Sequence, residues 1–169
     1  MLVVQMHGVP GSGKSTLARA LGQEIDAVVL DKDVIKAALL RSGLSGEQAA
    51  PAAYEAYFAL ARGLVAQGRS VILDNPVFWP SIEENWRALA AAAGSPLLMI
   101  ECACDDRTEL ARRLRERASL ESQQNAPYRR RRQGREWEPS CERLILDTTR
   151  PSGEILSAAV DYVRAGVAA

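Results

Sequence analysis

The chain has 169 residues, 47% of them hydrophobic, which is enough for one domain with a sizeable core. Its 21 basic and 21 acidic side chains balance, so the composition does not suggest bulk attraction to nucleic acid or to a membrane surface. Three cysteines without metal-ligand spacing, no basic leader and no apolar run of about 20 residues favour a reduced, cytoplasmic protein without a membrane span.

Strand-like and helical segments alternate along the chain, which predicts an α/β domain with a parallel sheet and helices on both faces. We find no linker, so residues 1–169 are expected to form one domain. The expected strands are residues 2–6, 27–30, 70–74, 96–102 and 141–149. The expected helices are residues 13–21, 33–41, 46–67, 81–93, 106–117 and 151–163. Residues 119–140 are polar, basic and interrupted by proline and glycine, which predicts a mobile, lid-like loop.

Several helix ends are marked by capping residues, glycine or proline. Ser45-Gly-Glu-Gln48 and Ser81-Ile-Glu-Glu84 have the spacing of a capping box, which predicts a helix start at each. Gly22 is expected to end the first helix, and Pro151 suits the first turn of the last one.

Residues 7–16 read HGVPGSGKST and directly follow an apolar strand. The spacing G-x-x-x-x-G-K-[ST] is that of a phosphate-binding loop, whose glycines let backbone N–H groups surround phosphates at a helix N-terminus. Lys14 is expected to reach the outer phosphates of ATP, and Ser15 to bind Mg²⁺. We expect Lys14 to be exposed, so that replacing it leaves the fold intact. The other expected nucleotide contacts are Gly8, Pro10, Gly11, Ser12, Gly13 and Thr16.

Two carboxylates follow the second expected strand, where the ligand crevice of a doubly wound sheet lies. Asp33 is the expected catalytic base, which accepts the proton of an attacking hydroxyl. Lys36 lies one helical turn later on the same face and is expected to contact the acceptor. Asp31 is expected to contact the acceptor, assist Mg²⁺ or orient the loop. Helix capping is the structural alternative for both aspartates.

Asp74 ends the apolar segment SVILD, a pattern in which the carboxylate holds Mg²⁺. A simple turn at the strand end is the alternative. The residue after Asp74 is Asn75 rather than a second acid. A second acid would activate water, so its absence at this position favours phosphoryl transfer. Phe78 and Trp79 follow, and they either wall an acceptor pocket or pin the turn.

Arg113 and Arg117 lie four residues apart, on one face of the helix that precedes the lid-like loop. We expect them to neutralise charge on the transferred phosphoryl group. Pairing with Glu109 or Glu116 on the surface is the alternative. The basic residues between 129 and 135 either close over phosphate, contact an anionic acceptor or are solvated, and closure would exclude water from the reaction.

Together these motifs resemble single-domain P-loop kinases related to polynucleotide kinase, chloramphenicol phosphotransferase and zeta-toxin-like proteins, often labelled AAA family ATPase. The resemblance rests on GVPGSGKST, LDKDVIK, AYFALARGLVAQGRSVILDNPVF, IECACDDRTELARRLRER and LDTTRP. It implies a three-layer fold with a five-stranded parallel sheet of order 2-3-1-4-5. It also implies an acceptor-activating aspartate at Asp33 and phosphate-contacting arginines at Arg113 and Arg117. The stretch Asp147-Thr148-Thr149-Arg150-Pro151 resembles the segment near the adenine ring, which implies nucleotide contacts at Thr149 and Arg150.

These features predict an ATP- and Mg²⁺-dependent phosphotransferase that acts on a hydroxyl of a small metabolite, nucleoside or antibiotic. One alternative is a nucleic-acid 5′-hydroxyl kinase, against which the balanced charge and the few aromatic residues weigh. Another is a nucleotide-binding regulatory or toxin-like protein with incidental ATPase activity. The sequence indicates neither the acceptor nor the oligomeric state.

Overall fold

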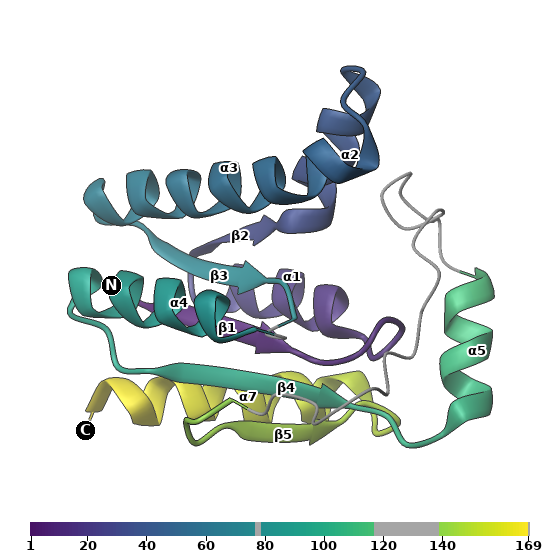
Figure 1. The fold of residues 1–169 in the computed structure, drawn as a ribbon. Coiled ribbons are helices and arrows are strands. Elements are labelled where there is room, and N and C mark those ends of the chain that lie inside the picture. Colours follow the sequence, from purple (N-terminus) through teal and green to yellow (C-terminus); the bar gives the residue numbers. More distant parts are fainter. Residues whose placement is uncertain (77–78, 117–138, 169) are drawn as a thin grey trace.

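One all-parallel sheet organises the structure, a computed structural model that describes residues 1–76, 79–116 and 139–168 (Figure 1). Its order is β2-β3-β1-β4-β5. This confirms the expected α/β fold and the strand order 2-3-1-4-5. The strands are β1 (Val3–His7), β2 (Ala27–Asp31), β3 (Ser70–Asp74), β4 (Leu98–Ala103) and β5 (Leu144–Asp147).

Helices cover both faces of the sheet (Figure 1). They are α1 (Lys14–Glu24), α2 (Lys32–Arg41), α3 (Gly46–Ala66), α4 (Pro80–Ala93), α5 (Arg107–Glu116) and α7 (Ser152–Ala168). On one face α1 and α7 pack against the sheet, where Val4 and Met6 are fully buried. On the other, α3 and α4 pack around Val3 and Leu73, and α2 lies against α3. Because both faces are covered, the central strands are apolar on both sides.

The carboxyl ends of β1, β2 and β3 meet at one edge of the sheet, because the strands are parallel and closely in register. Asp31 at the end of β2 pairs in register with Asp74 at the end of β3. The phosphate-loop motif follows β1 directly and begins at the same edge. The fold therefore brings three distant chain segments to the place where open α/β sheets bind ligands.

Gly22 does not end the first helix, so that prediction is wrong. The helix α1 continues to Glu24, and the turn comes at Asp26, which has a φ of 49°. A Cβ on Gly22 would lie 2.7 Å from Cγ2 of Val29 and 3.0 Å from the carbonyl oxygen of Ala27. The glycine therefore permits the close approach of α1 to β2.

The two capping-box predictions have different outcomes. The hydroxyl of Ser45 accepts from the N–H of Gln48 at 3.3 Å, and the Gln48 side chain accepts from the N–H of Ser45 at 3.1 Å, so this box is confirmed. The second prediction is wrong, because α4 begins at Pro80 with Trp79 as its N-cap, and Ser81 lies inside the first turn. Proline at the first helical position explains the earlier start, since its fixed φ suits a helix.

Three other elements have a boundary that differs from the expected one by two residues or more. The strand β4 begins at Leu98 rather than 96, and β5 is shorter than residues 141–149. The last helix continues beyond Val163 to Ala168. Pro151 lies just before that helix, and its carbonyl oxygen accepts from the N–H of Ile155 at 3.2 Å.

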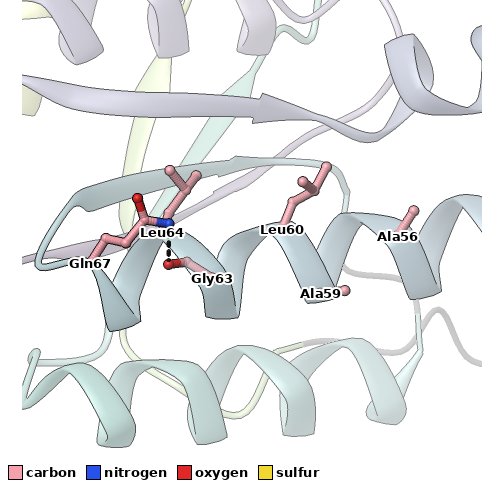
Figure 2. Close-up of a pocket in the computed structure, with 6 residues that line it drawn as sticks. All are labelled: Ala56, Ala59, Leu60, Gly63, Leu64 and Gln67. Carbon is pink, nitrogen blue, oxygen red and sulfur yellow. Dashed lines mark hydrogen bonds between the residues drawn. The ribbon is translucent and has the colours of Figure 1, made fainter.

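The outer face of α3 carries an open apolar depression, shown in Figure 2. Leu60 in it is 52% exposed. This half of α3 leads to the start of β3, at the sheet edge opposite the phosphate loop, so the depression is separate from the site described below. The residues that line the depression are Ala56, Ala59, Leu60, Gly63, Leu64 and Gln67.

Within the described ranges, no helix has the length and apolarity that crossing a membrane requires.

Candidate active site

The phosphate loop between β1 and α1 is shaped by three glycines with positive φ. The φ angles are 135° at Gly8, 85° at Gly11 and 86° at Gly13, a region that side chains disfavour. A Cβ on Gly8 would lie 2.5 Å from the carbonyl oxygen of Cys102, so the loop runs tightly against the end of β4. The glycines therefore permit both the turn of the loop and its close packing.

The loop has the properties of an anion site. The N-cap of α1 is Gly13, no side chain caps this end, and no acidic residue lies in the first turn. The first N–H groups of the helix and its partial positive charge are thus left for an anion. The hydroxyl of Ser12 is buried and has no hydrogen-bond partner among the described residues. A cradle of this kind fits the phosphates of a nucleotide, and Pro10 and Thr16 lie exposed on its rim.

Lys14 pairs with Asp74 across the sheet edge, with Nζ 3.1 Å from Oδ1. The Lys14 side chain is 15% exposed and that of Asp74 is 1% exposed. The expectation of an exposed lysine is therefore wrong, because the fold places Asp74 within reach of it. The hydroxyl of Ser15 and the carboxylate of Asp74 are oxygen ligands of the kind that Mg²⁺ prefers.

Asp31 caps the helix α2. Its Oδ1 accepts from the N–H groups of Asp33 at 2.8 Å and of Val34 at 3.4 Å. Burial, followed by the charge of Asp74, raises the pKa of Asp31 above its ordinary value. The capping alternative is therefore found for Asp31, although the same carboxyl also lies beside Asp74.

Asp33 pairs with Lys32, whose Nζ lies 2.5 Å from Oδ1. Its side chain is 33% exposed, so the carboxylate remains accessible from solvent. Lys36 lies one turn further along α2 and is partly buried. The structure thus places Asp33 at the expected sheet edge, with a lysine beside it that the sequence analysis did not select.

Tyr54 of α3 lies beside the Lys32–Asp33 pair. The ammonium group of Lys32 lies over the Tyr54 ring, 5.4 Å from its centroid, and Trp79 packs edge-on at a centroid distance of 6.5 Å. Burial, and next the charge of Asp33, raises the pKa of Tyr54 to about 12, although a hydrogen bond with Asn75 acts to lower it. The sequence analysis did not select Tyr54 as a site residue.

A buried network of hydrogen bonds holds the chain at the carboxyl end of β3. The hydroxyl of Tyr57 donates to Oδ1 of Asn75 at 2.6 Å, and the amide of Gln5 donates to the Asn75 carbonyl oxygen at 2.7 Å. These three side chains are at most 1% exposed. Fully buried hydrogen bonds fix the orientation of their partners, so Asn75 holds the chain firmly just after Asp74.

Arg113 of α5 lies beside the phosphate loop, with Nη1 3.8 Å from the position that a Cβ on Gly13 would take. Nη1 donates to Oγ1 of Thr148 at 3.0 Å and Nη2 to its carbonyl oxygen at 2.8 Å. Nε donates to Glu109 at 2.7 Å. Hydrogen bonds from Arg112 and then Arg113 lower the pKa of Glu109 to about 2. The guanidinium is therefore held next to the loop by both α5 and the segment after β5.

Two further predicted nucleotide contacts have partners in their own segment. The N–H and hydroxyl of Thr149 donate to Oδ1 of Asp147 at 2.9 and 2.8 Å. Arg150 pairs with Glu154 at 2.7 Å. Their neighbour Thr148, from the same adenine-side segment, is the residue that approaches Gly13. The predictions for Phe78, Arg117 and most of the lid-like loop, 119–138, concern residues outside the described part of the chain.

Residues 3–138 match the model of the family described as AAA domain. An uncharacterized protein of Mycobacterium tuberculosis is 34% identical over 107 residues, and an uncharacterized protein of Mycobacterium bovis matches equally well. The matched region covers 56% of this chain and 22% of either relative. The chain therefore spans about a fifth of the length of these curated relatives.

Solved structures of kinases share the fold. A candidate kinase from Chloroflexus aurantiacus superposes with a TM-score of 0.79 at 21% identity, over 98% of this chain and 97% of that one. The APS kinase CysC of M. tuberculosis, in complex with AMPPNP and APS, has a TM-score of 0.66 at 19% identity, over 96% and 97%. A gluconokinase from Sinorhizobium meliloti has a TM-score of 0.59 at 18% identity, over 98% and 94%. The protein therefore belongs to the AAA domain family, and its fold is that of the P-loop kinases.

Proposed function

We propose that the protein is a phosphotransferase that uses ATP and Mg²⁺ and transfers the γ-phosphoryl group to a hydroxyl of a small-molecule acceptor. The observation that carries this proposal is the line of charged groups along the sheet edge. Lys14 of the phosphate loop pairs with Asp74, and Asp74 pairs in register with Asp31, which precedes the Lys32–Asp33 pair. A hydroxyl held at Asp33 would thus lie across the strand ends from bound phosphates.

The proposed reaction is a direct transfer. The acceptor oxygen forms a bond to the γ-phosphorus, while the bond from that phosphorus to the β–γ bridging oxygen breaks and ADP leaves with the electron pair. The proton of the acceptor hydroxyl passes to the carboxylate of Asp33 and then to solvent. A positioned carboxylate base is the usual device for this proton in kinases.

The remaining residues bind and neutralise the donor. Lys14 and the glycines of the loop would hold the phosphates, and Ser15 and Asp74 would hold Mg²⁺. When bound, Mg²⁺ supplies charge neutralisation at the phosphate oxygens. Arg113 is already fixed beside Gly13, and we assign to it, and to Arg117, the stabilisation of charge as the phosphoryl group leaves. The APS kinase structure with AMPPNP and APS supports a donor and an acceptor site on this fold.

The single most informative test is a screen of alcohols for acceptor-stimulated ADP release with Mg²⁺-ATP. Asp33→Asn should lower acceptor-dependent turnover by roughly 100-fold or more, the range expected for loss of a general base. Affinity for AMPPNP should be unchanged in this variant. Asp161→Asn, an exposed aspartate on α7, is the matched control and should behave like wild type.

Equal losses of turnover and nucleotide affinity in Asp33→Asn would show that Asp33 is a structural or binding residue. ATP hydrolysis that no alcohol stimulates, with no effect of Asp33→Asn, would favour a nucleotide-binding regulator instead. The same screen includes an oligonucleotide with a free 5′-hydroxyl. Preferential transfer to it, lost steeply on addition of salt, would identify a nucleic-acid kinase.

A further inference from the structure

Four side chains at the ends of β2 and β3 form one continuous group, which we name the aromatic corner: Lys32, Asp33, Tyr54 and Trp79. Lys32 joins Asp33 to the face of the Tyr54 ring, and Trp79 meets Tyr54 at an interplanar angle of 89°. The residues come from α2, from α3 and from the N-cap of α4. The packing of these three helices therefore places two aromatic rings next to the proposed catalytic base.

The corner presents apolar surface to solvent. Trp79 is 54% exposed, although tryptophan is among the residues that gain most from burial. Val34, next to Asp33 on the first turn of α2, is 50% exposed. Tyr54 is less exposed than Trp79, so most of the exposed ring surface of the corner belongs to Trp79. Exposed aromatic surface beside convergent polar groups is typical of small-molecule sites.

Charge at this sheet edge is balanced among the described residues. Lys14 is paired with Asp74, and Lys32 is paired with Asp33. Asp31 offsets the third lysine, Lys36, in number, so this edge has no excess positive charge to attract an anionic acceptor, which would also approach the negative phosphates of the donor. An uncharged acceptor needs no excess positive charge at this edge, and the donor phosphates do not repel it. The charged side chains here are Asp31, Asp33 and Asp74 against Lys14, Lys32 and Lys36.

We propose that the aromatic corner is the acceptor subsite, and that it takes an uncharged alcohol whose hydroxyl lies next to a ring that stacks on Trp79. Tyr54 and Lys32 are positioning residues in this subsite, because they hold Asp33 and Trp79 in place. The ring is an aromatic ring or the apolar face of a sugar ring, since both stack on indole. This inference rests on the proposed function, because it names the substrate class of the same site.

The test compares matched alcohols. The uncharged ring probes are para-hydroxymethyl benzamide, for an aromatic ring, and methyl xylopyranoside, for a sugar ring. Their partners are para-hydroxymethyl benzoate, which differs by its negative charge, and xylitol, which has an open chain. Acceptor-stimulated ADP release gives kcat and KM for each, and the indole N–H resonance of Trp79 in an NMR titration reports binding without turnover. That resonance is assigned by its loss in Trp79→Phe.

We expect at least one uncharged ring probe to shift the Trp79 resonance saturably and to be phosphorylated, with its charged or open-chain partner much weaker. Trp79→Ala should raise the acceptor KM by about 10-fold, the value of one good aromatic contact, while the KM for ATP stays unchanged. Trp79→Phe should recover most of this loss. The control is Leu60→Ala, which removes a side chain of similar exposure from the far part of α3 and should change neither KM.

Two results would overturn the inference. One is a Trp79 resonance that no uncharged ring probe moves, or that the benzoate or xylitol moves at lower concentration. The other is a Trp79→Ala variant whose acceptor KM matches that of Leu60→Ala. Failure of the proposed function gives a different pattern: ring probes bind at Trp79, but no probe is phosphorylated. The relative effects on the two ring probes decide between an aromatic and a sugar ring.

Discussion

The guanidinium of Arg113 is fixed to Thr148 by two hydrogen bonds, one to the hydroxyl at 3.0 Å and one to the carbonyl oxygen at 2.8 Å. Thr148 is itself anchored, because its N–H and hydroxyl both donate to the carbonyl oxygen of Ala103, at 2.9 and 3.0 Å. Both side chains lie within 4 Å of the position that a Cβ on Gly13 would take. The segment after β5 thus orients an arginine of α5 against the phosphate loop.

Thr148→Val is expected to weaken nucleotide binding. The substitution keeps the shape of the side chain but removes the acceptor for Nη1 of Arg113. A hydrogen bond to a charged group is worth roughly 1.5–3 kcal/mol, so affinity for AMPPNP with Mg²⁺ should fall by about 10-fold or more, measured by isothermal titration calorimetry. Thr148→Ser should retain most of the affinity. Thr108→Val, at an exposed threonine of α5, is the control, and equal losses in the two valine variants would refute a specific role for Thr148.

Lys14→Met should destabilise the nucleotide-free protein as well as abolish phosphoryl transfer. The Asp74 side chain is 1% exposed and would lose its cationic partner. Leaving a buried charged group without its partner costs on the order of 1–3 kcal/mol or more in the free energy of unfolding, and the 15% exposure of Lys14 argues for the lower part of that range. Urea unfolding without nucleotide measures the change.

The double variant Lys14→Met/Asp74→Asn separates this ion-pair effect from a general disturbance of the loop. We expect it to recover stability but not transfer, because the buried charge is gone while the phosphate ligand is still missing. If Lys14→Met alone unfolds at the same urea concentration as wild type, the ion pair contributes nothing to stability.

Two glycines within helices are expected to respond oppositely to alanine. Gly22→Ala forces a Cβ to 2.7 Å from Val29 and 3.0 Å from the Ala27 carbonyl oxygen, and should cost about 1–3 kcal/mol through overpacking of α1 on β2. Gly63→Ala places a Cβ where nothing lies within 4 Å, and should stabilise α3 by about 0.5–1 kcal/mol. Thermal or urea unfolding of the pair checks both signs, and stabilisation by Gly22→Ala would show that the contact is not tight.

Asp31 and Asp147 should give the protein opposite pH dependences of stability. Burial and the charge of Asp74 raise the pKa of Asp31 above 3.8, so the folded state binds its proton more tightly than the unfolded chain does. The contribution of Asp31 is therefore fully present below 3.8 and is lost as pH rises through its raised pKa. Asp31→Asn keeps a capping oxygen and removes this loss, so its stability relative to wild type should increase as pH rises from below 3.8.

Asp147 is the matched opposite case. Hydrogen bonds from the N–H and the hydroxyl of Thr149 lower its pKa, so its contribution to stability is present above 3.8 and is lost as pH falls. Asp147→Asn should therefore lose stability relative to wild type as pH rises. Unfolding curves over the same pH range measure both variants, and slopes of the same sign would contradict the assignment.

The order of helices and strands could be read from the sequence because each element carries a local signal. The apolar segment SVILD predicted β3, and Ser45 with Gln48 marked the start of α3. The signals failed where packing or a neighbouring proline decided the outcome. Gly22 is of a type that often ends helices, yet it lies inside α1 and permits a close helix–strand contact. Ser81 is not the N-cap of α4, because the helix begins at Pro80 and Trp79 is its N-cap.

The site shows the same division. The sequence by itself determined the phosphate loop, since the spacing from Gly8 to Ser15 restricts the backbone locally. It also placed Asp31, Asp33 and Asp74 at or just after the ends of their strands. Only the tertiary structure decided which side chains meet: Lys14 with Asp74, Arg113 with Thr148, and Lys32 with Tyr54 and Trp79. These pairs join residues far apart in the chain, and no local pattern encodes their distances. Parallel strand register and helix packing set them, and with them the two sides of the candidate site.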